Sequence, residues 1–421
     1  MAIIEPFASV HYNPEAVEDI SKVVCPPYDI IDSHAQEEYY QKHPYNIIRL
    51  ILGKDFAGDK EGENKYTRAA AYIEDWQRRN ILVQDKESSI YIYEQDFRLG
   101  DQKKKRIGFI ALMRLDEEGQ GRSIYPHEST HAAPKEDRLK LIKEVDANLS
   151  PIFTIFSDPE GALKAYFKAI KTETKPFFEV VDDSGFQDRI WRVPQKSLID
   201  KIKELLSQKE VFIADGHHRY EVAKTFRDIK RREDPQKFKD AYNYIMTYFT
   251  PLEDEGLCIL PTHRLIKNAK FSGDDFTAYF AVKELSSKAE LMAEMKEKED
   301  QVGIFGMYQN KKFTLLRLSD KRECNRFIQE GPKEYKNLDV VILHKVILEN
   351  ILKVALSQIH YEVDLDEAVR RVDESEFDAL FVLNPTKIEQ IRAIALSGEV
   401  MPQKSTYFYP KLLSGLLIHK F

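Results

Sequence analysis

Residues 211–220 read Val-Phe-Ile-Ala-Asp-Gly-His-His-Arg-Tyr. Four apolar residues of strand length lead into an Asp-Gly turn, and a helical spacing of apolar residues begins directly after it at Tyr220 and Ala223. Asp215 can cap that helix, and Gly216 can adopt the positive φ that a tight turn requires. The segment therefore predicts a strand, a turn and a helix in immediate succession.

The turn also has the composition of an anion site. The first N–H groups of a helix have no partner within the helix and lie at the positive end of its dipole, so they favour an anion. His217, His218 and Arg219 add imidazole and guanidinium donors in the same turn, which suits a phosphate. The structural alternative is a capped helix with surface histidines. Neighbouring histidines project in different directions from a helix, so we expect no metal to be held by both.

A second segment, Pro126-His127-Glu128-Ser129-Thr130-His131, contains the HExxH pattern of zinc metalloproteases. That chemistry needs both histidines on a long helix, whereas Pro126 and Pro134 bound this segment and predict a loop. A carboxylate beside a histidine on a loop still suits general-base chemistry, which points to Glu128 and His127. A solvated loop is the alternative.

A third segment, residues 401–411, reads Met-Pro-Gln-Lys-Ser-Thr-Tyr-Phe-Tyr-Pro-Lys. Its prolines predict a rigid, extended loop. Lys404, Ser405, Thr406 and Lys411 have the composition of an oxyanion or phosphate clamp, and a rigid loop that packs aromatic rings is an equally good interpretation. The segments 25–29 and 261–264 are similarly dense in functional side chains.

The charge balance bears on the class of partner. The 421 residues include 63 Lys and Arg against 70 Asp and Glu, a net charge of −7 that argues against a surface built mainly to bind a nucleic-acid backbone. A local basic groove stays compatible with that balance. We interpret the basic run 103–106 as the solvated tip of a hairpin whose loop is 99–105.

Neither a GxxxxGK[ST] nor a GxGxxG motif is present, which excludes P-loop and Rossmann-type nucleotide sites.

The cysteines and the apolar stretches indicate a compartment. Cys25, Cys258 and Cys324 are scattered without a CxxC pair, which fits a reducing environment. No stretch reaches the 18 or so apolar residues of a membrane span, and the first residues lack the pattern of an export signal. We therefore expect a cytoplasmic protein without a membrane segment.

The pattern of elements predicts a mixed α/β fold. Helical spacing recurs at 65–80, 134–145 and 339–354, and apolar runs of strand length alternate with these helices. We expect a mixed sheet covered by helices. Three portions are predicted: an N-terminal α/β portion at 1–105, a core at 106–270 and a C-terminal α/β portion at 271–421.

Several ordered blocks resemble the domain-of-unknown-function family numbered 1015 over nearly the whole chain. The blocks are CPPYD (25–29), HPYNIIRL (43–50), HESTHAAPKEDRLKLI (127–142), ANLSPIF (147–153), ADGHHRYE (214–221), PTHRL (261–265) and MPQKSTYFYPKLLSG (401–415). A more distant similarity of the central part is to the ParB/sulfiredoxin-like fold and, within it, to nucleotide-dependent free-serine kinases. There a proline-His-Glu segment precedes an Asp-Gly-His-Thr-Arg segment, and His218 stands here in place of the threonine.

The kinase resemblance implies roles for the two segments. It implies Glu128 as catalytic base, in the segment that also contains the catalytic candidate His127, and Asp215 as a second acidic catalytic group or magnesium ligand. It implies that Gly216, His217, His218 and Arg219 bind nucleotide phosphates. The implied ligands are ADP or ATP with Mg, and the implied partner is a small hydroxylated metabolite, with free serine favoured.

Three functional hypotheses follow. The first is a nucleotide- and Mg-dependent phosphotransferase acting on a small hydroxylated metabolite. The second is a ParB-like, nucleotide-gated binding or switch protein without turnover, against which the acidic charge and the missing DNA-binding motif count. The third is a metal-dependent hydrolase at residues 127–131. A nucleic-acid partner is not expected, and the oligomeric state is left open.

Overall fold

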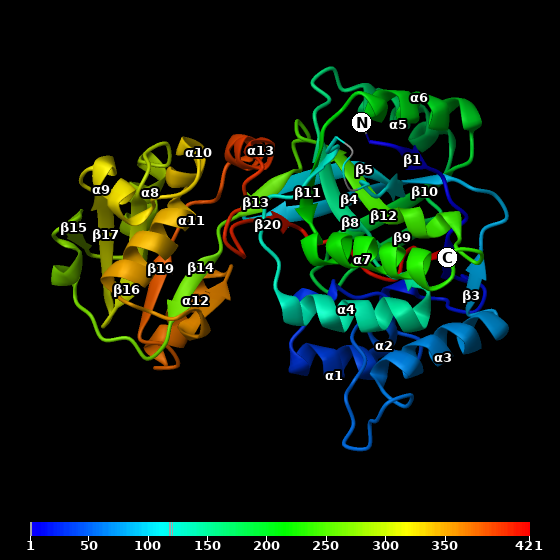
Figure 1. The fold of residues 1–421 in the computed structure, drawn as a ribbon, viewed down its shortest axis with the longest axis horizontal. Helices are drawn as coiled ribbons and strands as arrows, with labels where there is room; N and C mark the ends of the chain where they lie inside the picture. The colour runs from blue at the N-terminus through cyan, green and yellow to red at the C-terminus, as the bar shows by residue number, and fades with distance from the viewer. Residues whose placement is uncertain (1, 118, 120) are drawn as a thin grey trace. The chain divides into compact units, whose positions relative to one another are not determined.

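The computed structural model describes residues 2–117, 119 and 121–421, with the side chain of Cys324 outside the description. Two compact units are present (Figure 1). Unit 1 comprises Met1–Tyr125, Thr130–Cys258 and Pro410–Phe421, and unit 2 comprises Pro126–Ser129 and Ile259–Tyr409. The chain thus passes between the units more than once. The predicted portions 1–105, 106–270 and 271–421 stay a prediction about folding units.

Unit 1 is built on a mixed sheet with the strand order β6-β11-β8-β12-β5-β4-β10-β9, and β1 pairs with β5 at its side. The β11–β6 and β12–β8 pairs are parallel, and the other pairs are antiparallel. The predicted mixed α/β class is confirmed. The strands are β1 (Ile4–Glu5), β4 (Ile90–Leu99), β5 (Gln102–Arg114), β6 (Ile124–Tyr125), β8 (Ile152–Phe156), β9 (Phe178–Val181), β10 (Gln187–Val193), β11 (Val211–Asp215) and β12 (Tyr244–Pro251).

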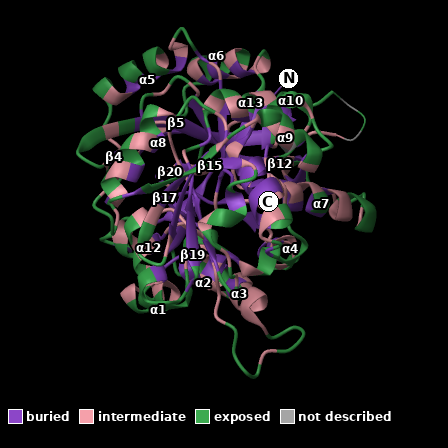
Figure 2. Cartoon of the chain, turned by 90° about the vertical axis from the view of Figure 1, so that its left-hand side faces the viewer, coloured by how far each residue is buried: buried purple, intermediate pink, exposed green. Residues whose placement is uncertain are grey.

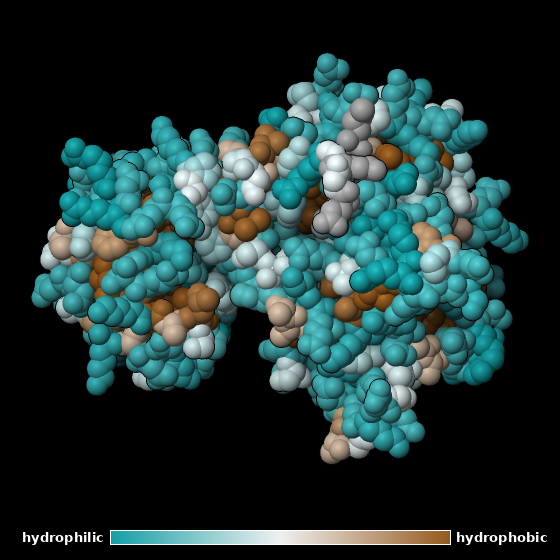
Figure 3. Space-filling view, in the orientation of Figure 1, coloured by the Kyte–Doolittle hydropathy of each residue, from teal (hydrophilic) through white to brown (hydrophobic). Residues whose placement is uncertain are grey.

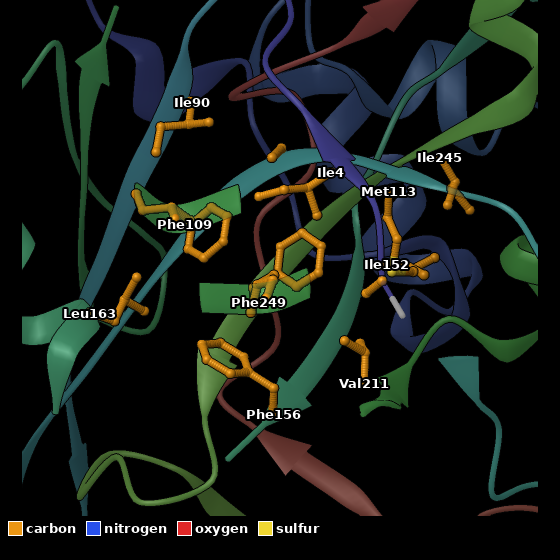
Figure 4. Close-up of a cluster of buried hydrophobic side chains, with 14 of the residues drawn as sticks. Ile4, Ile90, Phe109, Met113, Ile152, Phe156, Leu163, Val211, Ile245 and Phe249 are labelled. Carbon is orange, nitrogen blue, oxygen red and sulfur yellow. The ribbon is translucent and has the colours of Figure 1, made fainter. Parts of the chain in front are cut away.

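The main core of unit 1 lies on this sheet. β8, with the sequence IFTIF, is buried at every residue, which is why four of its five residues are apolar instead of alternating with polar ones. The rings of Phe109 and Phe249 stack with their centroids 4.9 Å apart, and Leu163 and Val211 belong to the same cluster (Figure 4). Buried residues are concentrated in the strands, whereas the helices carry exposed residues on their outer faces (Figure 2).

Helices surround the sheet of unit 1. Apolar residues of α5 and α6 join the main core, and α4 packs against α7 and also against α3. A smaller core around Trp76 joins α2, α3 and α4 to the pair β2–β3. The helices are η1 (Ile20–Lys22), η2 (Tyr28–Ile30), α1 (Ser33–Lys42), α2 (Ile48–Ile51), α3 (Lys65–Arg78), α4 (Ala132–Val145), α5 (Ala162–Glu173), α6 (Lys196–Ser207), α7 (His217–Glu233) and η3 (Asp240–Asn243).

Two short strand pairs hold the ends of unit 1. β2 (Val10–Tyr12) pairs with β3 (Leu82–Gln84), and β21 (His419–Lys420) pairs with β7 (Ala147–Asn148). The C-terminal segment of the chain is therefore part of the same unit as the N-terminal segment.

The β4–β5 hairpin differs from the prediction. The expected loop 99–105 is wrong, because β5 begins at Gln102 and Leu99 pairs directly with Gln102 across the turn. Gly100 has a φ of +57°, which allows a two-residue turn at Gly100 and Asp101. Lys103, Lys104 and Lys105 consequently lie within a strand and not at a loop tip.

Unit 2 has its own sheet, with the order β15-β17-β16-β19-β14-β18. Its core includes Leu265, Leu291, Leu315 and Leu380. The strands are β14 (His263–Ile266), β15 (Phe280–Leu285), β16 (Ile304–Gln309), β17 (Lys312–Leu318), β18 (Ile359–Glu362) and β19 (Ala379–Val382), and β13 (Cys258–Leu260) pairs with β20 (Tyr407–Tyr409). The helices are η4 (Gly273–Phe276), α8 (Lys288–Glu297), α9 (Lys321–Phe327), α10 (Lys333–Lys336), α11 (Asp339–Ile342), η5 (Leu343–Ile351), η6 (Leu356–Gln358), α12 (Leu365–Asp373) and α13 (Ile388–Ser397).

One predicted helix of unit 2 changes type along its length. The α-helix expected at 339–354 is α-helical only in α11, and η5 continues as a π-helix. The predicted apolar stripe of Val340, Leu343, Ile347 and Ile351 is buried at its first three positions, whereas Ile351 is half-buried. A π-helix widens each turn by one residue, which sequence periodicity does not reveal over so short a stretch.

The structure shows the polarity of the surface and the state of the cysteines, which the sequence described only by composition and spacing. Hydrophilic side chains cover most of the face seen in Figure 3. Across residues 2–117, 119 and 121–421, no helix combines the length and the apolar character that crossing a membrane requires. Cys25 and Cys258 are free thiols.

Candidate functional site

Asp215 ends β11, and Gly216 connects it directly to α7, as the sequence predicts. Gly216 has a φ of +92°, in the region that favours glycine. A Cβ at this position would lie 2.9 Å from Cγ2 of Ile152 and 3.1 Å from the guanidinium carbon of Arg219. Glycine is therefore needed both for the backbone conformation and for the close approach of Arg219. The 17-residue helix α7 starts with Gly216 as its N-cap, so the predicted capping by the Asp215 side chain is wrong.

The Asp215 carboxylate instead holds two cations. Arg219 Nη2 donates to Asp215 Oδ2 at 2.7 Å, and Lys411 Nζ donates to Oδ1 at 2.5 Å. A further guanidinium nitrogen of Arg219 donates to the carbonyl oxygen of Pro151. Both side chains are largely buried, at 15% exposure for Arg219 and 9% for Lys411. The start of α7 therefore carries two positioned cations, one of which comes from the C-terminal segment of the chain.

The two histidines of the turn have separate surroundings. His217 is buried, and His218 is half-buried. The backbone N–H of His131 donates to His218 Nε2 at 3.0 Å, so in this arrangement the His218 ring proton is on Nδ1. Thr130 Oγ1 donates to Glu221 on α7 at 2.8 Å, and this fixes the end of the 127–131 segment to the same helix.

Two small cavities adjoin Arg219. One, of about 10 Å³, has room for a single water molecule and is lined by Asp215, Arg219 and Lys411 together with apolar residues. The other, of about 60 Å³, is mainly apolar and lies beside Tyr28, whose pKa is raised to about 12 by burial. Residues at these cavities come from blocks far apart in the sequence: Pro27, Tyr28, Arg138, Leu141, Ser150, Pro151, Phe153, Lys411 and Leu412. Sequence reasoning assigned no role to Tyr28 or Ser150, although each lies in one of the family's sequence blocks, whereas Arg138 was predicted as a charged group that could hold an anion or a metal.

A second cluster, in unit 2, is centred on Glu128. The backbone N–H and the hydroxyl of Thr406 both donate to Glu128 Oε1 at 2.8 Å. His127 Nε2 lies 2.9 Å from Thr406 Oγ1. A threonine hydroxyl has one proton, which goes to Glu128, so the His127 Nε2–H donates to Thr406. Met401 N–H donates to the His127 carbonyl at 2.7 Å and holds the two segments together.

Arg264 is fully buried in the same unit. It donates to the carbonyl oxygens of Thr262 and Lys404 and, from Nε, to His344 Nε2 at 3.3 Å. Burial lowers the pKa of Arg264 to about 10, and the nearby Tyr361 and Glu128 act in the opposite direction. Burial lowers the pKa of His344 to about 3, which keeps that ring neutral and able to accept from Arg264. Sequence reasoning noted Arg264 only as part of 261–264, and no signal indicated His344.

The predicted clamp of residues 404–411 is divided between the two units. Ser405 donates to the Pro402 carbonyl at 2.6 Å within its own loop, and the Lys404 carbonyl accepts from Arg264. Lys411 belongs to unit 1. The two groups of predicted residues are Asp215, Gly216, His217, His218, Arg219 and Lys411 in unit 1, and His127, Glu128, Lys404, Ser405 and Thr406 in unit 2.

The geometry of a zinc metalloprotease is not formed. The 126–131 segment is not helical, because α4 begins only at Ala132, so the loop prediction is confirmed. In the part of the chain that the structure describes, no cluster of three or more His, Cys, Asp or Glu side chains is arranged to hold a metal ion. Both oxygens of Asp215 are engaged by cations.

Comparison with solved structures finds weak similarities. A substituted free serine kinase in complex with ADP has a TM-score of 0.35 and 13% identity, over 70% of this chain and 89% of its own. A conserved hypothetical protein from Pyrococcus furiosus has a TM-score of 0.34 and 15% identity, over 70% and 92%. Truncated SbnI from Staphylococcus aureus has a TM-score of 0.35 and 11% identity, over 74% and 87%. Similarity at this level assigns no role to any residue here.

Comparison with protein families gives a clear result, while no curated protein matches the sequence. The family described as "Protein of unknown function (DUF1015)" matches residues 4–341, which span all of unit 1 except its ends and a large part of unit 2. The match confirms the resemblance that the ordered sequence blocks indicated. The chain belongs to the DUF1015 family.

Proposed function

We propose that this protein binds a nucleotide by its phosphates at the start of α7 and transfers a phosphoryl group to a small hydroxylated metabolite, with free serine the favoured acceptor. The observation that carries the proposal is the pair of cations, Arg219 and Lys411, held on Asp215 at the N-terminus of a long helix. Phosphoryl transfer depends mainly on positioning and on neutralising charge, and these groups supply both.

Each group of the turn has a distinct part in this proposal. The Arg219 guanidinium offers a planar fork that fits phosphate oxygens, whereas the Lys411 ammonium acts as a compact point charge. Asp215 keeps both cations beside the first N–H groups of α7, and it acts as a positioning residue. Gly216 lets the backbone approach the ligand closely.

Glu128 is the proposed catalytic base. A hydroxyl is a weak nucleophile at its free pKa and needs a base to accept its proton. The two hydrogen bonds from Thr406 leave the second carboxylate oxygen, Oε2, outside that interaction. His127 acts through Thr406 and is proposed as a positioning residue.

In this proposal, Mg²⁺ binds to the protein only together with the nucleotide. Mg²⁺ is usually held by one or two carboxylates together with substrate phosphates. Asp215 is the predicted carboxylate ligand, but its oxygens are already paired with Arg219 and Lys411. When bound, the ion would neutralise phosphate charge.

We also infer a cytoplasmic location from the scattered cysteines.

Thermal unfolding with ADP, ATP, CTP or GTP plus Mg tests the proposed nucleotide site. A ligand at 100 times its dissociation constant adds about 2.7 kcal/mol of stability. We expect a stabilising shift that disappears in Arg219→Ala and persists in Arg232→Ala, which removes an exposed arginine from the same helix. The absence of a shift with every nucleotide would refute the proposal.

Turnover measurements separate a kinase from a nucleotide-gated switch. Glu128→Gln removes the base but keeps the size of the side chain and its ability to accept from Thr406. We expect it to abolish phosphoryl transfer while the nucleotide-dependent thermal shift stays. A switch protein would show no turnover in the wild type and little change in the variant.

A further inference from the structure

Unit 1 contains a large open groove away from Asp215. Its volume is about 1580 Å³, well above the 300–1,000 Å³ that is usual for a small-molecule site. The end of β4, the start of β5, one side of α5 along its length and the turn before β10 form its walls. None of the residues that line the Arg219 cavities lines this groove. The groove is thus a separate feature of the unit.

Cations line the groove on two sides. Lys103 and Lys104 lie on β5, and Lys164 and Lys168, one helical turn apart, lie on α5. Arg98 lies at the end of β4, beside the β5 lysines. In the described residues none of these five side chains forms an ion pair with a carboxylate. Lys104 Nζ donates only to the carbonyl oxygen of Glu255, at 3.5 Å.

Other charges in the groove are already neutralised. Glu94 is 1% exposed and pairs with Lys105, Lys171 and Arg189. Asp96 pairs with Lys105 and Arg189. The carboxylates that remain are Glu160, Asp254 and Glu255, and Asp254 is half-buried and accepts from the Gly256 and Ile107 N–H groups. Five unpaired cations therefore face three carboxylates, in a chain whose net charge is −7.

Two rows of like charge across one groove repel each other unless an anion lies between them. Lysine ammonium groups suit phosphates, because a compact charge meets a group with several acceptor oxygens. Phe186 is half-buried in the wall, with its ring 6.0 Å from that of Phe97, and adds an apolar surface for the uncharged part of a ligand. We propose that this groove binds a ligand that carries several phosphates, independently of the nucleotide proposed at Asp215.

Two doubly substituted proteins test the groove. Lys164→Glu with Lys168→Glu reverses two charges of the α5 wall. Lys143→Glu with Lys196→Glu makes the same change of charge at two exposed lysines of unit 1 that do not line the groove. The probes are a fluorescent eight-nucleotide oligothymidylate, followed by anisotropy, and inorganic tripolyphosphate as its competitor. Binding is measured at salt concentrations from 50 to 300 mM.

We expect the groove variant to bind the probe at least about tenfold more weakly than the control variant, which is about 1.4 kcal/mol. The slope of log affinity against log salt should fall by about 0.7 for each lost contact, or by about 1.4 in total. Competition by tripolyphosphate would show that a chain of phosphates is sufficient, and failure to compete would show that the bases contribute. Both results support a phosphate-rich ligand.

Three results would overturn the proposal. The first is no binding of either probe at 50 mM salt. The second is an equal loss of affinity in both double variants, which would indicate attraction by overall charge alone. The third is binding of a poly-glutamate peptide as tightly as the oligonucleotide, which would make the groove a site for an acidic peptide.

Discussion

Gly216 has only a hydrogen in place of a side chain, and the Arg219 guanidinium lies in the space that a side chain would need. A Cβ there would meet Ile152, which is fully buried in β8 and cannot move aside, and also the Arg219 guanidinium. The same residue has a positive φ, at which an L side chain is strained. Backbone strain and steric contact at this residue can be separated by experiment.

Gly216→Ala is expected to lower the free energy of unfolding by about 2–4 kcal/mol, because strain and contact add. Gly185→Ala is the matched control: Gly185 has a φ of +75°, and a Cβ would meet nothing within 4 Å. It should cost only about 1 kcal/mol. Urea unfolding measures both. Equal losses in the two variants would mean that the contact with Ile152 and Arg219 is unimportant.

The Thr406 hydroxyl connects His127 to Glu128, and its removal gives a second prediction at the same scale. Thr406→Val keeps the shape but leaves the buried His127 N–H without its acceptor, at a cost of about 1–3 kcal/mol. Turnover should fall with it, because Glu128 keeps only the backbone N–H. Thr406→Ser keeps the hydroxyl and should stay near wild type in both measurements. Similar turnover in the two variants would remove the hydroxyl from the mechanism.

At the scale of elements, the sequence predicted structure formed by consecutive residues, but it did not predict contacts between residues far apart in the chain. The β11–α7 unit was predicted because its apolar run, its Asp-Gly turn and its helical spacing lie within one stretch of sequence. The ion pair between Asp215 and Lys411 was not predicted, since the two residues lie 196 positions apart in the sequence. The division of 404–411 between two units likewise depends on tertiary structure. The order of strands in the sheet depends on packing between segments that are distant in the sequence, and the pattern within one segment does not reveal it.

The neighbouring strands β4 and β10 bury a carboxyl that makes stability depend on pH. Asp188 is 1% exposed, and Tyr93 Oη donates to its Oδ1 at 2.6 Å. Burial raises the pKa of Asp188 to about 7. Between about pH 4 and 7 the folded state therefore holds a proton that the unfolded state has lost. By linkage, this group makes the protein less stable as pH rises through that window.

Asp188→Asn removes this proton but keeps an oxygen that can accept from Tyr93. The wild type should lose about 1.4 kcal/mol per pH unit relative to the variant between about pH 4.5 and 6.5. Urea unfolding of both proteins at pH 4.5, 5.5 and 6.5 provides the comparison. Parallel stability curves would show that Asp188 is ionised in the folded protein.

For the whole molecule, the course of the chain makes unit 1 depend on a segment that follows nearly all of unit 2 in the sequence. Residues 259–409 belong to unit 2, and only then does the chain return to unit 1 as Pro410–Phe421. That segment supplies β21, Lys411 and the Pro410 carbonyl that accepts from the buried Arg106 at 2.6 Å. It also buries five aliphatic side chains: Leu412, Leu413, Leu416, Leu417 and Ile418.

A chain that ends at Tyr409 should therefore lose the fold of unit 1 and keep that of unit 2. Five buried aliphatic side chains at about 1.5–3 kcal/mol each contribute about 10 kcal/mol, which is comparable to the whole stability of a typical domain. Hydrogen exchange distinguishes the units: amides of β8 and β11 should exchange rapidly in the truncated chain, while those of β16 and β19 stay protected by their own core. Protection retained in β11 would show that unit 1 folds without its C-terminal segment, and Lys411 would then serve the ligand alone.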